Sequence, residues 1–131
     1  MKKIITFGTF DVFHIGHINI LERAAAYGNH LTVGVSSDEL NFSKKQRYPI
    51  YTQQDRMKII SSMKVVDDVF LEESLDKKLD YIKKYGADIL IMGDDWLGKF
   101  DWVKTDCDVI YLPRTPSIST TEIIEVVKTL R

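Results

Sequence analysis

Short apolar segments alternate with segments of helical periodicity along the chain, and this alternation most strongly limits the possible folds. Strand-like apolar runs are expected at residues 3–7, 31–35, 66–71, 88–92 and 109–112. Helices are expected between and after them, at residues 16–27, 52–63, 75–85 and from 119 through 127. Strands that are joined by helices pair in parallel, with right-handed crossovers. We therefore predict an α/β fold over residues 1–131, a single-domain doubly wound (Rossmann-like) parallel sheet with helices on both faces.

Turn and capping residues mark the ends of the expected helices. Gly28 and Gly86 each follow a helical segment, where glycine commonly ends a helix. Thr52 and Ser119 each begin a pattern that resembles a capping box. The segment 41–50 has no helical period and ends near a proline, so we expect a mobile basic loop there. Its cations are Lys44, Lys45 and Arg47.

Composition and charge exclude several classes of partner. The chain has 18 basic and 19 acidic residues, for a formal net charge of -1. That balance gives no extended positive field for nucleic acid or an anionic membrane, so recognition of phosphate must be local. The single cysteine, Cys107, excludes an internal disulfide. No apolar stretch approaches the ~20 residues of a membrane span. We expect a cytoplasmic protein with no nucleic-acid and no membrane partner.

The segment 8–17, GTFDVFHIGH, lies between the first expected strand and the first expected helix. Gly8 and Gly16 allow a ligand to approach the backbone closely. The amides that begin the following helix favour anions. His14 and His17 are three residues apart, so they can face the same bound group. This segment therefore predicts a pocket for a chain of phosphates.

Two other interpretations of the histidine pair remain open at this point. Either imidazole could simply cap the helix or lie on the surface. A metal site that includes His30 or an acid as a third ligand is disfavoured, because no cysteine or glutamate stands at ligand spacing. The glycines also lack the spacing of a dinucleotide-binding fingerprint. We therefore assign no residue as a metal ligand.

Three segments resemble a known family. The segment 8–17 is similar to the signature of the nucleotidyltransferase superfamily that carries a His-x-Gly-His motif. The segment 114–121, RTPSISTT, resembles the second signature of its cytidylyltransferase branch, Arg-Thr-x-Gly-Ile-Ser-Thr-Thr, with Ser117 in place of the family's glycine. The segment 92–96, MGDDW, also resembles that branch. In its small size the chain resembles the bacterial glycerol-3-phosphate cytidylyltransferases.

This resemblance implies a reaction, a cofactor and an assembly. CMP would pass from CTP to glycerol 3-phosphate by in-line attack at the α-phosphorus, giving CDP-glycerol for teichoic acid synthesis, and pyrophosphate. Mg²⁺ would accompany the triphosphate, and the protein would form a homodimer. Alternative acceptors are phosphocholine and phosphoethanolamine. Each carries a cationic group, which would be expected to bind in a box of aromatic side chains. Aromatic residues for such a box are Tyr51, Trp96, Phe100 and Trp102. An adenylyltransferase and a non-catalytic nucleotide-binding module remain as further alternatives.

The residue types and the resemblance together assign roles to residues. The expected catalytic residues are Thr9, His14, His17, Lys44 and Arg114. The nucleotide is expected to contact Thr9, Phe10, His14, Gly16, His17, Gly93, Asp94, Arg114, Thr115, Ser119 and Thr120. The acceptor substrate is expected to contact Asp11, Asp38, Lys44 and Arg56.

Several of these roles have alternatives. Lys45 or Arg47 could replace Lys44, and Arg56 could be a surface residue of its helix. Asp11 could contact Mg²⁺ or orient a neighbouring amide. Ser119 and Thr120 could act only as caps, and Asp94 could belong to a hydrated turn.

Overall fold

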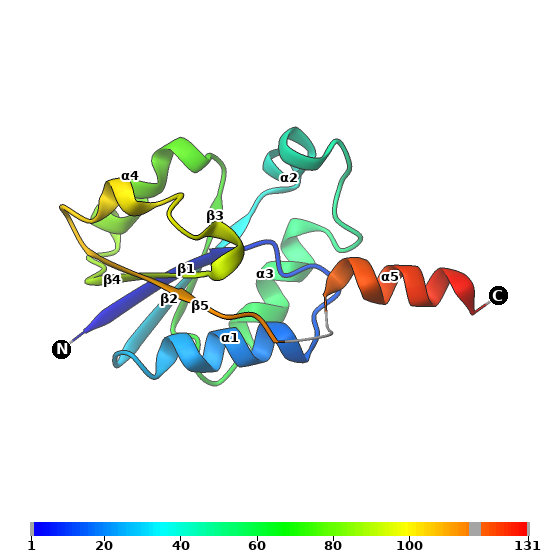
Figure 1. The fold of residues 1–131 in the computed structure, drawn as a ribbon, viewed down its shortest axis with the longest axis horizontal. Coiled ribbons are helices and arrows are strands. Elements are labelled where there is room, and N and C mark those ends of the chain that lie inside the picture. The colour runs from blue at the N-terminus through cyan, green and yellow to red at the C-terminus, as the bar shows by residue number, and fades with distance from the viewer. Residues whose placement is uncertain (1, 116–118, 131) are drawn as a thin grey trace.

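The computed structural model describes residues 2–115 and 119–130 (Figure 1). Its sheet has five parallel strands in the order β3-β2-β1-β4-β5. The strands are β1 (Lys3–Gly8), β2 (His30–Ser36), β3 (Asp68–Glu72), β4 (Ile89–Gly93) and β5 (Asp108–Leu112). The predicted parallel sheet is confirmed. Ser117, at which the second signature departs from the family pattern, lies outside the described residues.

Five α-helices and three short 3-10 turns connect or follow these strands in the described part of the chain. The helices are α1 (Ile15–Ala25), α2 (Asp38–Lys45), α3 (Gln53–Ser61), α4 (Lys78–Lys84) and α5 (Thr120–Thr129). The 3-10 turns are η1 (Leu75–Lys77), η2 (Asp94–Trp96) and η3 (Asp101–Val103). Among the described residues, no helix is both long and apolar enough to cross a membrane.

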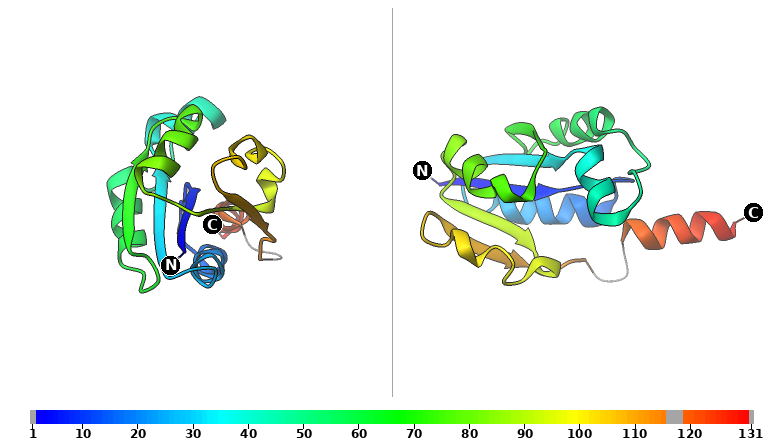
Figure 2. Two further views of the ribbon diagram at one scale, coloured as in Figure 1. Left: turned by 90° about the vertical axis from the view of Figure 1, so that its left-hand side faces the viewer. Right: turned by 90° about the horizontal axis from the view of Figure 1, so that it is seen from above.

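The sheet has a hydrophobic core on each face, as a doubly wound fold requires. Figure 2 shows helices on both sides of the sheet. Successive residues of a strand point to opposite faces. In β1, Ile4 therefore packs in the core that contains Leu21 of α1 and Ile60 of α3. Ile5 packs in the opposite core, which contains Ile82 of α4. Helices thus cover both faces of the sheet, as predicted.

Helix α2 corrects the prediction of a loop over residues 41–50. Residues 38–45 are helical, and only the following segment is a loop. The Ser37 hydroxyl caps α2 by accepting a hydrogen bond from the Leu40 amide at 3.0 Å. Acidic residues occupy the first turn and Lys44 and Lys45 the last, which favours the helix dipole. Gln46 ends the helix in the left-handed region, with φ 59°.

The strand order reverses between β1 and β4. From β1 the chain proceeds to β2 and β3 on one side, and then crosses to β4 and β5 on the other. Ligands of open α/β sheets bind at such a switch point, beyond the carboxyl ends of the strands. The β1–α1 loop at this place is strained, because Phe10 and Val12 have φ values of 54° and 47°. Backbone strain of this kind is concentrated at functional sites.

Candidate active site

Two adjoining cavities lie at the switch point and form one cleft. The first, of about 330 Å³, is lined by the β1–α1 loop, β4, the segment after α2 and the start of α5. The second, of about 220 Å³, lies between α1, Arg114 and the start of α5. Residues that border both cavities are His17, Ile20, Gly93, Asp95 and Thr120. The Thr120 hydroxyl donates to the Asp11 carbonyl at 2.7 Å, so the two signature segments are in direct contact.

The two histidines are held by hydrogen bonds at the beginning of α1. His14 is the N-cap, and its Nδ1 accepts from the Gly16 amide at 3.0 Å. Nδ1 of His17 accepts from the His14 amide at 3.1 Å. The rings stack, with their centroids 3.8 Å apart. Since an Nδ1 that accepts carries no proton, each neutral imidazole carries its proton on Nε2.

Burial favours the uncharged form of both imidazoles. It lowers the pKa of His17 to about 3, and the nearby His14 contributes in the same direction. Burial also lowers the pKa of His14, with a further contribution from the positive charge of Arg114. His14 and His17 therefore cap the helix through Nδ1 and are hydrogen-bond donors through Nε2. The capping interpretation and the phosphate-binding interpretation are compatible.

Other residues of the first motif border the cleft. Phe10 is buried, and its ring packs against His17 with a centroid separation of 5.5 Å. A Cβ at Gly8 would lie 2.7 Å from the Phe10 ring, so glycine is required for this packing. The Thr9 hydroxyl donates to Oδ1 of Asn41 at 2.8 Å. Gly16 borders the second cavity.

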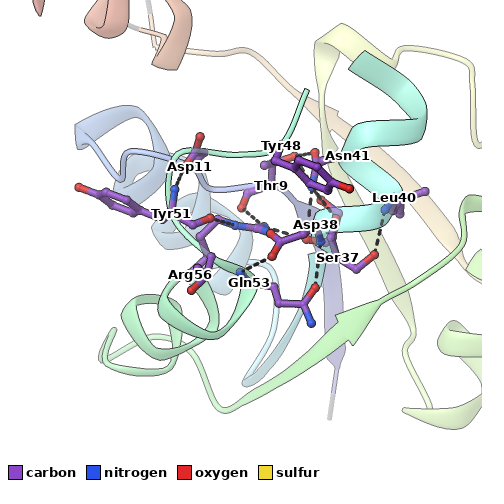
Figure 3. A network of polar contacts seen from close by, with 12 residues as sticks. Thr9, Asp11, Ser37, Asp38, Leu40, Asn41, Tyr48, Tyr51, Gln53 and Arg56 are labelled. Carbon is purple, nitrogen blue, oxygen red and sulfur yellow. Dashed lines mark hydrogen bonds and ion pairs between the residues drawn. The ribbon is translucent and has the colours of Figure 1, made fainter. Parts of the chain in front are cut away.

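Three of the four residues expected to bind the acceptor belong to an internal polar network (Figure 3). The carboxylate of Asp11 accepts the amides of Ile50 and Tyr51 at 2.7 and 2.8 Å. Asp38 accepts a bond from Arg56 at 2.7 Å and one from the Gln53 amide at 3.3 Å. Asp11 thereby holds the segment that follows α2 against the β1–α1 loop, and Asp38 joins the beginning of α2 to α3.

Arg56 belongs to the same network and lies in the interior. Its side chain has no exposed surface, so the alternative of a surface helix residue is wrong. Besides the Asp38 carboxylate, its guanidinium binds the carbonyls of Thr9, Ser36 and Tyr51. In this arrangement Arg56 presents no open bidentate edge toward the cleft.

The cations of the α2 region differ in their placement. Lys45 and Arg47 line the first cavity. Nζ of Lys44 lies 5.7 Å from the Trp96 ring centroid, beside the cleft. Burial lowers the pKa of Lys44, although Glu72 acts in the opposite direction. Which of the three meets the phosphates stays a prediction, and Lys45 and Arg47 have the more direct access here.

The second signature contributes residues to the second cavity. Arg114 pairs with Asp95 at 3.6 Å, and both residues line this cavity. The Ser119 hydroxyl caps α5 by accepting from the Glu122 amide at 3.1 Å. The Thr115 hydroxyl accepts a bond from the Asn19 side chain at 3.0 Å. Phosphate binding at this helix beginning stays a prediction.

The turn after β4 places its two acids differently. Gly93 and Asp95 border both cavities. Both acids are exposed, but Asp94 borders neither cavity, and its carbonyl accepts the Leu97 amide at 3.0 Å. Asp95 therefore lies closer to the candidate nucleotide site than Asp94, the residue that the sequence pattern favoured.

Sequence reasoning missed two buried groups near the cleft. Asn41 borders the first cavity although it is only 1% exposed. Lys78 and Glu72 form a buried ion pair, and Nζ of Lys78 lies 3.8 and 4.7 Å from the ring centroids of Phe7 and Phe100. Burial lowers the pKa of Lys78, and Glu72 acts in the opposite direction. No local pattern marks these groups, because their partners belong to different elements.

The cleft offers little to hold a metal ion by protein ligands alone. Within residues 2–115 and 119–130, no three His, Cys, Asp or Glu side chains converge in a way that could bind one. Both carboxylate oxygens of Asp11 already accept main-chain amides. The described residues therefore do not fit a metal site formed by the protein alone.

Comparison with known proteins gives concordant matches. The family model described as cytidylyltransferase-like matches residues 5–126. The glycerol-3-phosphate cytidylyltransferase of Bacillus spizizenii is 47% identical over 123 residues, covering 94% of this chain and 95% of that protein. The enzyme of the same name from Staphylococcus aureus is 43% identical and covers 94% of this chain and 92% of its own.

A solved structure supports the fold. The lipopolysaccharide core biosynthesis protein of Thermoplasma volcanium superposes with a TM-score of 0.74 at 24% identity, over 88% of this chain and 98% of its own. At this identity the likeness concerns the fold alone.

Proposed function

The chain belongs to the cytidylyltransferase-like family, and on that premise we propose that it transfers CMP from CTP to glycerol 3-phosphate. The products are CDP-glycerol and pyrophosphate. Near-complete coverage by relatives of that name, at 43% and 47% identity, is the observation that carries the proposal. The cleft supports it, because it joins the two histidines to the second signature segment.

The chemistry needs no general base from the protein. A phosphomonoester has a second pKa of about 6, so at neutral pH its phosphate group is mostly a dianion. Its oxygens are therefore already deprotonated nucleophiles. That oxygen attacks the α-phosphorus of CTP, and the bond between the α-phosphorus and the bridging oxygen of pyrophosphate breaks. Catalysis then depends on aligning two anions and on stabilising the charge of the transition state.

The neutral histidines suit this task. In the proposed reaction, Nε2–H of His14 and of His17 donates to oxygens of the α-phosphate and of the leaving pyrophosphate. Hydrogen bonds fix both rings through Nδ1, so these donors need no reorganisation during the reaction. Loss of one such donor typically lowers kcat by about a hundredfold. Thr9 and Phe10 contribute the adjoining backbone.

Cations supply the remaining neutralisation of charge. Lys45, Arg47 and Arg114 line the two cavities, and Lys44 lies beside them. CTP is proposed to enter as its Mg²⁺ complex, with the metal held mainly by the triphosphate. Alanine variants of Lys44, Lys45 and Arg47, compared by KM for CTP, identify the cation that meets the phosphates.

Two lysines that lie over aromatic rings favour an uncharged alcohol over a cationic one. Phosphocholine would need aromatic faces for its quaternary ammonium group. The faces of Phe7 and Phe100 are taken by the ammonium group of Lys78, and that of Trp96 by Lys44. A cationic acceptor would meet like charges at each of these rings, whereas glycerol would not.

Release of pyrophosphate from CTP tests the reaction and the acceptor together. The purified protein is offered glycerol 3-phosphate, phosphocholine or phosphoethanolamine in parallel, with ATP in place of CTP as a further arm. We expect release only with CTP and glycerol 3-phosphate. Release of pyrophosphate with a cationic acceptor would overturn the assignment of glycerol 3-phosphate as the acceptor. Release with ATP would favour an adenylyltransferase. Binding of CTP without any release would favour a binding module.

We further propose a homodimer in the cytoplasm, whose product feeds teichoic acid synthesis without a nucleic-acid or membrane partner. Helix α5 extends away from the sheet (Figure 1) and exposes apolar side chains, which supports self-association. Those exposed side chains are Val126, Val127 and Leu130. Sedimentation equilibrium that gives only a monomer at assay concentrations would rule the dimer out.

A further inference from the structure

Two buried polar side chains from different helices hold the same residue of the β1–α1 loop. Arg56 of α3 is 0% exposed and Asn41 of α2 is 1% exposed. Arg56 binds the carbonyl of Thr9 at 2.9 Å, and Asn41 binds its hydroxyl at 2.8 Å. Figure 3 shows both side chains directed at Thr9, that of Arg56 from α3 and that of Asn41 from α2. Thr9 is therefore fixed through its main chain and its side chain together.

The guanidinium of Arg56 is committed to the protein itself. Nη1 donates to the carbonyls of Thr9 and Ser36 at 2.9 and 2.7 Å, and Nε donates to that of Tyr51 at 3.0 Å. Nη2 donates to the Asp38 carboxylate at 2.7 Å. To reach a substrate phosphate, Arg56 would have to abandon buried acceptors, which would then lack partners. Its geometry fits a positioning role better than contact with a ligand.

The orientation of the Asn41 amide follows from its neighbours. Nδ2 faces the carbonyls of Ser36 and Ser37, at 3.3 and 2.9 Å, and a carbonyl can only accept. Oδ1 must then be the atom that faces Thr9. The hydroxyl proton of Thr9 is consequently directed at Asn41, which fixes the χ1 angle of Thr9 and the direction of the adjoining backbone.

We propose that Arg56 and Asn41 are positioning residues of the transfer reaction, which act by fixing Thr9 at the entrance to the phosphate site. The inference rests on the proposed function, because its readout is the rate of cytidylyl transfer. A displacement of about 1 Å in a site that aligns two reactants can lower the rate about a hundredfold. The effect of each residue is therefore transmitted through Thr9.

A double-mutant cycle between Asn41 and Thr9 tests this transmission. Asn41→Ala is expected to lower kcat about tenfold in the wild-type background, and by less than about twofold when Thr9→Val is already present. Thr6→Val is the matched control, since it also removes a buried hydroxyl bond, to the Ile91 carbonyl. We expect that control to lower Tm and leave kcat within about twofold. Additive effects of Asn41→Ala and Thr9→Val on kcat would overturn the proposal.

Two variants of Arg56 separate positioning from contact with the acceptor. Arg56→Lys keeps the charge but cannot reach all four acceptors, and Arg56→Met removes the charge. A positioning role predicts that both lower kcat about tenfold or more, with KM for glycerol 3-phosphate within about threefold of wild type. A KM that rises more than about tenfold in Arg56→Met, but not in Arg56→Lys, would show direct contact and overturn the proposal.

Wild-type activity separates this inference from the proposed function. If wild-type protein releases no pyrophosphate, the proposed function fails before any variant is compared. Circular dichroism of each variant establishes that it is folded. If neither Arg56 variant folds, the cycle between Asn41 and Thr9 decides the proposal alone.

Discussion

The imidazole of His17 should stay neutral far below the pH at which an exposed histidine takes up a proton. Burial and the adjacent His14 lower its pKa to about 3. At pH 6 the ratio of protonated to neutral His17 would then be roughly 10⁻³, whereas an imidazole with a pKa of about 6.5 would be about three-quarters protonated. NMR titration of the histidine ring carbons in the free enzyme measures this directly.

The same neutrality determines how the rate depends on pH. If His17 acts as a neutral donor, kcat/KM for glycerol 3-phosphate should follow the second ionisation of the acceptor phosphate. With that pKa at about 6, the value falls about tenfold from pH 8 to pH 5 and is flat above pH 7. A second limb that falls as the pH rises through 7 would refute the reasoning, because it would show that a protonated imidazole is required.

Linkage gives a matching effect on stability. The pKa of His17 is lower in the folded than in the unfolded chain. The contribution of neutral His17 to the free energy of unfolding is therefore fully present above pH 6.5, and it is lost progressively as the pH falls toward 3. Between pH 7 and 5, the free energy of unfolding should fall more steeply in wild type than in His17→Gln. Equal slopes in urea titrations would contradict the lowered pKa.

Three further single substitutions and one double variant have defined outcomes. Gly8→Ala should displace the Phe10 ring and lower kcat at least tenfold, at a cost of about 1–3 kcal/mol in unfolding free energy; unchanged kinetics would disprove the packing argument. Asp11→Asn retains one acceptor for two amides, so urea unfolding should show a loss of about 1–3 kcal/mol and the assay a higher KM for CTP. Glu72→Gln should cost about 3 kcal/mol or more, because it leaves Lys78 buried without a carboxylate. A Glu72→Leu/Lys78→Met double variant should recover most of that loss, and equal stability of the two variants would contradict this.

The predicted parts of the fold are those with strong local signals. The apolar runs of the five strands and the glycine after α4 carry their information within a few residues, and the structure confirms them. Helix α2 was missed because its one buried residue, Asn41, is polar. Hydrophobic periodicity cannot detect a helix that buries an amide, and the capping Ser37 lies before residues 41–50, the segment predicted to be a loop.

In the candidate site, too, residues that belong to local motifs could be predicted, whereas residues whose partners are distant in sequence could not. The motif around His14 could be located because the chemistry of phosphate binding requires glycines, a helix beginning and imidazoles close together in sequence. The motif around Ser119 could be located only by its resemblance to the family signature, because its residues alone equally fit a helix cap. The surroundings of Arg56 could not be predicted, since its acceptors come from residues 9, 36, 38 and 51. Only the folded sheet brings those segments together.

The path of oxygen through the reaction tests the central claim most directly. Glycerol 3-phosphate that carries ¹⁸O in its phosphate group is incubated with CTP, Mg²⁺ and the protein, and both products are analysed by mass spectrometry and ³¹P NMR. Attack by the phosphomonoester oxygen on the α-phosphorus predicts CDP-glycerol that retains all of the label, with one ¹⁸O in the bridge between its two phosphorus atoms, and pyrophosphate that contains none. Label in the pyrophosphate, or a bridge without ¹⁸O, would contradict direct transfer.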